Sequence, residues 1–104
     1  IVGVNHLIGH IYSLFIEKEA IFPLTVLLVS GGHTQVMEVS SLTQIDTVAK
    51  SMDDSFGESF DKVAKMMGLG YPGGPLIEKL AKDGERKKYP FTIPLHQSPK
   101  IAFS

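Results

Sequence analysis

The sequence predicts an α/β fold, α+β within these 104 residues, in which helices flank a three-strand antiparallel meander. An apolar run at 24–30, a Gly-Gly turn and an alternating run at 34–40 are typical of a β-hairpin. The segment 44–51 continues the pattern as a third strand. Apolar residues also recur at helical spacing over 6–18 and again from residue 56 to residue 67, which indicates amphipathic helices on both sides of the strands.

The first helix is predicted over 6–18, with Asn5 as its N-cap, because an asparagine oxygen accepts hydrogen bonds from early backbone N–H groups. Gly9 lies inside this helix at a cost of about 1 kcal/mol relative to alanine. Its presence indicates that something packs closely against the backbone there. The strand at 24–30 is almost wholly apolar, which favours a buried central position.

The second helix is predicted to begin at Ser55, which matches the capping-box pattern together with Glu58. Gly68 is its predicted C-cap. After a loop at 70–75, Pro75 suits the first position of a third helix that runs to residue 82.

The segments 89–94 and 100–104 are expected to be edge or irregular strands. Pro90 and Pro94, and Pro99 just before the second segment, exclude a central position in a sheet, because proline has no backbone N–H to donate.

The composition excludes several classes of protein. Ten Lys and Arg residues against eleven Asp and Glu give a net charge of −1, unlike a free-standing nucleic-acid binder. The absence of cysteine excludes disulfides and cysteine metal sites. No apolar run approaches the roughly 18 residues of a membrane span, so a soluble cytoplasmic protein with no membrane partner is expected.

The chain begins at Ile1 rather than Met, and its last four residues resemble a strand in progress. We therefore expect residues 1–104 to be a single partial domain, an internal piece of a longer protein. Such a piece would leave apolar surface uncovered, and a homodimer is one way to cover it.

The first candidate site is the pair His6 and His10. Residues four apart lie on one helical face, so both imidazoles can bind one transition metal. Two ordinary helix histidines are the alternative. Leu7 stands where zinc metalloproteases carry their general-base glutamate, so a metal site is favoured over a protease site.

The second candidate is the glycine turn between the first two strands. Gly31 and Gly32 lack Cβ atoms, so backbone N–H groups there can approach an anion closely, as in a phosphate-binding nest. A plain hairpin turn with incidental polar neighbours is the alternative. The candidate binding residues of this segment are Val29, Ser30, Gly31, Gly32 and His33.

Two further motifs follow along the chain. Asp54, Glu58 and Asp61 fall near one helical face and can contact a metal or a ribose, or form a solvated face paired with Lys62 and Lys65. The loop at 71–75 precedes a helix, whose free N–H groups can bind phosphate or approach a sugar or base. Here the alternative is a simple connecting loop.

These four motifs resemble, in this order and spacing, the pattern of the tRNA threonylcarbamoyladenosine transferase family, TsaD, formerly called Gcp or glycoprotease. The matching patterns are Asn-His-x-x-Gly-His, Leu-Val-Ser-Gly-Gly-His-Thr, Asp-Asp-x-x-Gly-Glu-x-Phe-Asp-Lys and Tyr-Pro-Gly-Gly-Pro. The likeness covers the chain apart from the looser stretches 40–50 and 84–99. The final Ala-Phe-Ser resembles the start of another segment of that family.

The resemblance implies part of an actin/Hsp70-like ATPase fold of the ribonuclease H-like type. Residues 1–23 would be a metal-ligand helix from the first lobe, and 24–104 the meander and helices of the nucleotide-binding lobe. The implied reaction transfers a threonylcarbamoyl group from threonylcarbamoyl-AMP to N6 of the adenosine next to the anticodon, in tRNAs reading codons that begin with A.

The resemblance also implies ligands. His6 and His10 match metal ligands, for iron or zinc, and a later aspartate that this chain lacks completes that set. The segment 29–33 matches the loop that contacts the acyl-adenylate or ATP phosphates, where magnesium can accompany the nucleotide. Asp61 and Gly74 match positions that contact the adenosine. TsaB-like and TsaE-like proteins and tRNA are the implied partners, and the piece alone is expected to be inactive.

Two other functions remain open at this point. A zinc metalloprotease would use His6 and His10, but it lacks the glutamate after His6. A non-catalytic homologue would act as a dimerisation partner, although the degenerate TsaB partner lacks the histidine pair that is present here. A soluble α/β domain with no retained site is the plainest reading.

Overall fold

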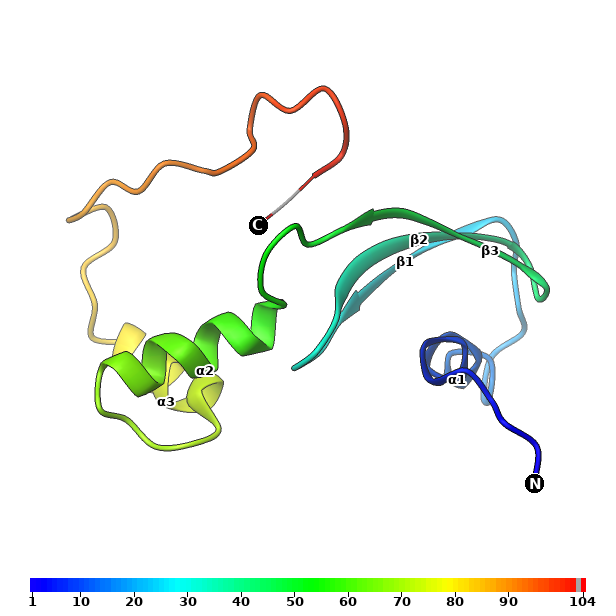
Figure 1. Ribbon diagram of the computed structural model, residues 1–104, viewed down its shortest axis with the longest axis horizontal. Helices are drawn as coiled ribbons and strands as arrows, with labels where there is room; N and C mark the ends of the chain where they lie inside the picture. Colours follow the sequence, from blue (N-terminus) through cyan, green and yellow to red (C-terminus); the bar gives the residue numbers. More distant parts are fainter. Residues whose placement is uncertain (103) are drawn as a thin grey trace.

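The computed structural model describes residues 1–102 and 104. The described residues form three strands and three helices. In chain order these are α1 His6–Ser13, β1 Leu24–Val29, β2 Thr34–Ser41, β3 Gln44–Lys50, α2 Phe56–Met66 and α3 Gly73–Ala81. The strands pair antiparallel in the order β1-β2-β3 (Figure 1), which confirms the predicted meander and its α+β class.

The molecule is open in shape. Figure 1 shows α1 against the sheet at one end, the α2–α3 pair at the other, and the irregular C-terminal segment arching back toward the connection between β3 and α2. The radius of gyration is 17.0 Å, whereas a compact domain of about 100 residues has about 13 Å. Within the described residues, no helix is long and apolar enough to cross a membrane.

A small hydrophobic core joins α1 to the sheet. Ile11 is 1% exposed and packs with Val26, Met37 and Val39. Alternate residues of β2 point into this core because side chains alternate across a strand. The Tyr12 hydroxyl also donates to the Leu42 carbonyl at 2.5 Å, so α1 is tied to the turn between β2 and β3.

The strand bounds agree with the sequence prediction to within one residue, but the predicted central position of β1 is wrong. The central strand is β2, and the described residues leave alternate β1 side chains exposed, with Leu27 at 65% and Val29 at 47%. An apolar pattern shows that a face can be buried, and it does not show which segment covers it.

The start of α1 is as predicted and its end is not. Asn5 Oδ1 accepts from the N–H groups of Leu7 and Ile8 at 3.0 and 3.2 Å. The helix ends at Ser13, five residues earlier than predicted. The backbone hydrogen bonds that follow join residues three apart, as in a 3₁₀ turn, and the Ser13 hydroxyl donates to the His10 carbonyl. The close packing expected at Gly9 is not found among the described residues, because a Cβ there would meet none of their atoms within 4 Å.

The later elements differ in two further ways. Helix α3 begins at Gly73, so Pro75 is its third residue, which is tolerated because the first N–H groups of a helix have no partner within it. The described residues of 89–94 and 100–104 form no strand, because neither segment pairs with a neighbouring strand. Phe103, part of the second prediction, lies outside the described residues.

Candidate functional site

The glycine turn between β1 and β2 is closed by Ser30. Its N–H donates to the His33 carbonyl at 2.8 Å, and its hydroxyl accepts from the His33 N–H at 3.0 Å. A Cβ on Gly31 or Gly32 would meet nothing within 4 Å, and neither residue has a positive φ. These glycines therefore leave open space beside the backbone, and no left-handed conformation requires them.

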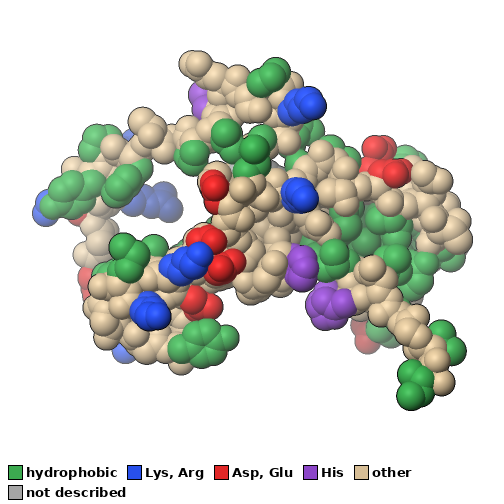
Figure 2. All heavy atoms as spheres, viewed as in Figure 1, with side chains coloured by type: hydrophobic (Ala, Val, Ile, Leu, Met, Phe, Trp, Pro, Cys, Tyr) green, Lys and Arg blue, Asp and Glu red, His purple; other side chains and the backbone are tan. Residues whose placement is uncertain are grey.

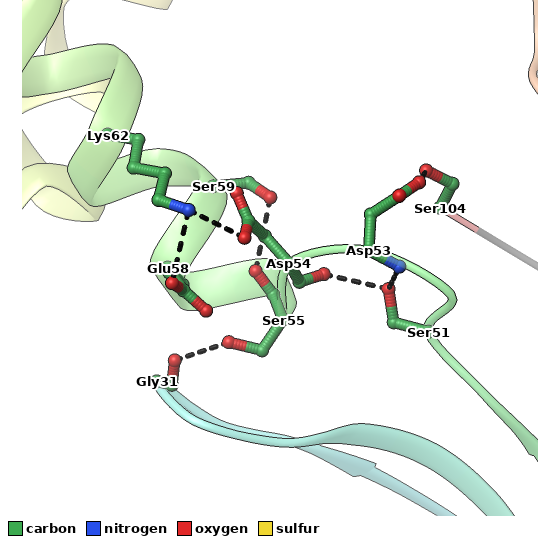
Figure 3. Close-up of polar contacts among 9 residues, drawn as sticks. All are labelled: Gly31, Ser51, Asp53, Asp54, Ser55, Glu58, Ser59, Lys62 and Ser104. Atoms are coloured by element: carbon green, nitrogen blue, oxygen red, sulfur yellow. Dashed lines mark hydrogen bonds and ion pairs between the residues drawn. The ribbon is translucent and has the colours of Figure 1, made fainter.

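The start of α2 lies directly on this turn (Figure 3). The Ser55 hydroxyl, in a residue only 6% exposed, donates to the Gly31 carbonyl. The Phe56 N–H donates to Thr34 Oγ1 at 2.7 Å, and the Gly57 N–H to the Ser30 carbonyl at 3.3 Å. The predicted capping box is therefore wrong, because Ser55 uses its hydroxyl on the turn and Thr34 caps the helix instead.

Gly57 is a close-packing position that sequence reasoning missed. A Cβ there would lie 2.7 Å from Gly31 Cα and 3.1 Å from the Ser30 carbonyl oxygen, and both atoms belong to the backbone. Only glycine allows α2 to approach the turn this closely. The signal in the sequence is a glycine in the first turn of a helix, where it is otherwise unfavourable.

Asp61 connects α2 to α3. Its Oδ1 accepts from the Gly73 N–H at 2.7 Å, at the first residue of α3. A Cβ on Gly73 would lie 2.6 Å from Ala64 Cβ, so this glycine sets how closely the two helices pack. A carboxylate at the start of α3 is also favoured by the helix dipole.

One cavity, of about 660 Å³, lies between the turn, α2 and α3. Its lining includes Gly31, Asp61 and Gly74, which come from three separate motifs, together with the aromatic rings of Phe60 and Tyr71. A Cβ on Gly74 would meet nothing within 4 Å, so the backbone of α3 is accessible at this point. The volume falls within the range of about 300–1,000 Å³ that is usual for small-molecule sites.

One lysine bridges two carboxylates at the start of α2. Lys62 Nζ lies 2.6 Å from Asp54 Oδ1 and 3.2 Å from Glu58 Oε1 (Figure 3). The hydrogen bond to Asp54, and then that to Glu58, raises the pKa of Lys62 above its usual 10.5. Among the described residues Lys65, the other expected partner, forms no ion pair.

The histidine pair on α1 converges as predicted from its spacing. The Nε2 atoms of His6 and His10 lie 3.1 Å apart. Two nitrogens bound to one tetrahedral zinc at about 2.05 Å are separated by about 3.3 Å, so the two rings fit a shared metal. Within residues 1–102 and 104, no group of three or more metal-binding side chains forms around this pair.

The turn links the histidine pair to the cavity. Gly31 lines the cavity, while the His33 ring lies 6.4 Å from the His6 ring, centroid to centroid. Figure 2 shows histidine side chains and acidic side chains on the same face of the molecule. Of the five predicted turn residues, Gly31 alone lines the cavity, and Val29 ends β1 opposite Thr34.

Comparisons with known proteins identify the family of the chain. The family model described as TsaD, tRNA N6-adenosine threonylcarbamoyltransferase, matches residues 1–104. A protein of that name from Sulfurimonas denitrificans is 83% identical over 104 residues, which are 100% of this chain and 32% of the relative.

A protein of that name from Nitratiruptor sp. is 64% identical over 100% of this chain and 32% of its own length. Another, from Helicobacter pylori, is 59% identical over 96% of this chain and 30% of its own length. The chain thus spans about a third of the length of the curated relatives it matches. It belongs to the TsaD family of tRNA N6-adenosine threonylcarbamoyltransferases.

Proposed function

We propose that this chain supplies the nucleotide-contacting turn and two metal ligands of an enzyme that transfers a threonylcarbamoyl group from threonylcarbamoyl-AMP to N6 of a tRNA adenosine. The observation that carries the proposal is the cavity lined jointly by Gly31, Asp61 and Gly74. These residues are up to 43 positions apart, and each was predicted from a different motif. An incidental turn, acidic face and connecting loop would have no reason to meet at one cavity.

The adenosine would occupy the end of the cavity formed by α2 and α3. Tyr71, 85% exposed, offers an aromatic surface for the base. Asp61 Oδ1 is occupied by the Gly73 N–H, and its other oxygen is available to a ribose hydroxyl. The open space beside the Gly74 backbone allows the sugar or base to lie close to the start of α3.

The phosphate would lie at the Gly31–Gly32 edge of the turn, where no side chain occupies the space. Val29 and Ser30 would fix this turn from the strand end, and His33 would face the acyl group. In the transfer, the bond from N6 to the carbamoyl carbon forms, the bond from that carbon to the phosphate oxygen breaks, and AMP leaves. N6 loses a proton to solvent. The chain contributes by positioning the reactants.

The convergent imidazoles of His6 and His10 fit one divalent metal, iron or zinc, with the remaining ligands outside these residues. A metal bound there would supply Lewis-acid chemistry. The two histidines orient the site, and the turn holds His33 beside them. Magnesium would accompany ATP if ATP replaces the acyl-adenylate.

We also propose partner proteins, a lobe assignment and a cell compartment. TsaB-like and TsaE-like proteins would be partners, and exposed apolar residues such as Leu27 and Ile21 would pack against a partner, the remainder of the enzyme or a second copy. Residues 1–23 would belong to the first lobe and 24–104 to the nucleotide-binding lobe. A tRNA substrate implies a cytoplasmic enzyme.

The test uses the full-length enzyme that contains this chain. It is incubated with ATP, threonine, bicarbonate, unmodified tRNA and its partner proteins, and the tRNA nucleosides are then weighed by mass spectrometry. We expect threonylcarbamoyladenosine from the parent and none from His6→Ala or Gly32→Asp. Folded parent enzyme that leaves the tRNA unmodified with all partners present would contradict the proposal.

A further inference from the structure

Thr34 joins two parts of the site. It is the first residue of β2 and pairs with Val29 across the turn, while its carbonyl accepts from the Ser51 N–H at 2.9 Å. Its backbone is therefore held by the strands on both sides. Its side chain reaches out of the sheet, where Oγ1 accepts from the Phe56 N–H at 2.7 Å.

The bond to Phe56 fixes where α2 begins. The N–H groups in the first turn of a helix have no partner within the helix, and here Thr34, from a different element, supplies one. Asp61 lies five residues further along the same helix, about 7.5 Å along its axis. A shift of the helix start relative to the turn therefore moves Asp61, and with it Gly73 and the start of α3.

We propose that Thr34 is a positioning residue, whose hydroxyl sets the separation between the phosphate-contacting turn and the adenosine-contacting end of the cavity. Ser55 acts with it, because its buried hydroxyl donates to the carbonyl of Gly31, the turn residue that lines the cavity. The inference rests on the proposed function, since it concerns how the same site holds an adenylate.

In the two hydrogen bonds between the turn region and the start of α2, one hydroxyl accepts and the other donates, so each hydroxyl has its own partner. Thr34 accepts from the helix, whereas Ser55 donates to the turn. The absent Cβ of Gly57 lets the helix approach closely enough for both bonds to form. Removing either hydroxyl leaves the fold of the sheet intact and loosens the span between the two ends of the cavity.

The test measures AMP binding by isothermal titration calorimetry with the full-length protein. The variants are Thr34→Val, which keeps the shape and removes the acceptor, and Thr34→Ser, which restores a hydroxyl. Thr25→Val, the same change at an exposed position of β1, is the matched control. Zinc binding by His6 and His10 and amide exchange at Phe56 are measured on the same samples.

We expect Thr34→Val to weaken AMP binding about three- to tenfold, the effect of one lost hydrogen bond. Thr34→Ser should stay within about twofold of the parent, Thr25→Val should match it, and zinc binding should be unchanged in all three. Exchange at the Phe56 amide should be faster in Thr34→Val only. A merely structural role would not weaken AMP binding while leaving zinc binding intact, and serine would not rescue it selectively.

The inference is overturned if Thr34→Val exchanges faster at Phe56 and still binds AMP as the parent does, or if Thr34→Ser is as weak as Thr34→Val. Should Thr34→Val fail to fold, Ser55→Ala must show the same loss of AMP affinity, and parental affinity in that variant refutes the inference. A folded parent that binds no AMP instead refutes the proposed function.

Discussion

Replacing Gly57 with alanine tests the contact between α2 and the glycine turn. The new Cβ would lie 2.7 Å from Gly31 Cα, 3.1 Å from the Ser30 carbonyl oxygen and 3.2 Å from the Gly31 nitrogen. All three are backbone atoms of a turn closed by its own hydrogen bonds, so no flexible side chain can move aside. Ordinary contact begins near 3.4 Å, so the helix must shift by about 0.7 Å.

The magnitude follows from two opposing effects. Overpacking a close contact costs about 1–3 kcal/mol, and the shift lengthens the bond from the Phe56 N–H to Thr34. Alanine is favoured over glycine in a helix by up to about 1 kcal/mol. The net loss in the free energy of unfolding is about 1–2 kcal/mol, which lowers Tm by about 2–8 °C at 2–4 °C per kcal/mol.

The assay is thermal unfolding of the full-length protein, with Gly9→Ala as the matched control. Gly9 is also helical, but a Cβ there has open space, so alanine should leave Tm unchanged or raise it. A Gly57→Ala protein with the parental Tm or a higher one would refute the reasoning, as would an equal decrease in Gly9→Ala.

Three further predictions concern the metal pair, the turn and the acidic face. His6→Ala should abolish zinc binding in equilibrium dialysis with elemental analysis, because one imidazole of the pair is lost, whereas His96→Ala should retain it. Gly32→Ala should unfold at the parental Tm, since its Cβ meets nothing, yet bind AMP more weakly in calorimetry; parental AMP affinity would contradict a phosphate at this edge. The pKa of Lys62 is raised in the folded state, so its ion pairs stabilise fully below about pH 10.5 and their contribution is lost as pH rises through the higher folded value. The Tm difference between the parent and Lys62→Met should therefore shrink as the pH rises above about 10.5, and a constant difference would contradict this.

Local features of the fold could be predicted from the sequence. The Asn5 cap and the hairpin around the glycine turn agree with the structure, as does Gly68, whose φ of 72° ends α2. Each depends on a few adjacent residues, whose preferred backbone conformations and capping bonds are intrinsic.

Features set by distant partners could not be predicted. The capping-box pattern identified Ser55 as the N-cap residue, which is correct, but its hydroxyl accepts no capping bond and instead donates to the carbonyl of Gly31, 24 residues away. Close packing was expected at Gly9 and is found at Gly57 and Gly73, because a glycine in a helix indicates a close approach only when another element lies there. The edge position of β1 could not be predicted either, because it depends on which other strand pairs with it.

The candidate site was predicted as four separate motifs, and the structure shows which of their residues lie close together. Gly31, Asp61 and Gly74 share a cavity, and His6 and His10 converge. The roles of these residues toward a metal, an adenylate and tRNA stay predictions. Thr34, Ser55 and Gly57 hold these parts together through contacts between residues far apart in the sequence, so their roles could not be predicted from local patterns.

The central claim, that the cavity between α2, α3 and the turn holds the adenosine of an adenylate, is tested most directly by photolabelling. Full-length protein is irradiated with 8-azido-AMP, digested with trypsin and mapped by mass spectrometry, with and without excess AMP. We expect label that AMP competes away in the tryptic peptide 66–79, which carries Tyr71 and Gly74. Label that AMP does not displace, or displaceable label confined to peptides that do not line the cavity, would contradict the account.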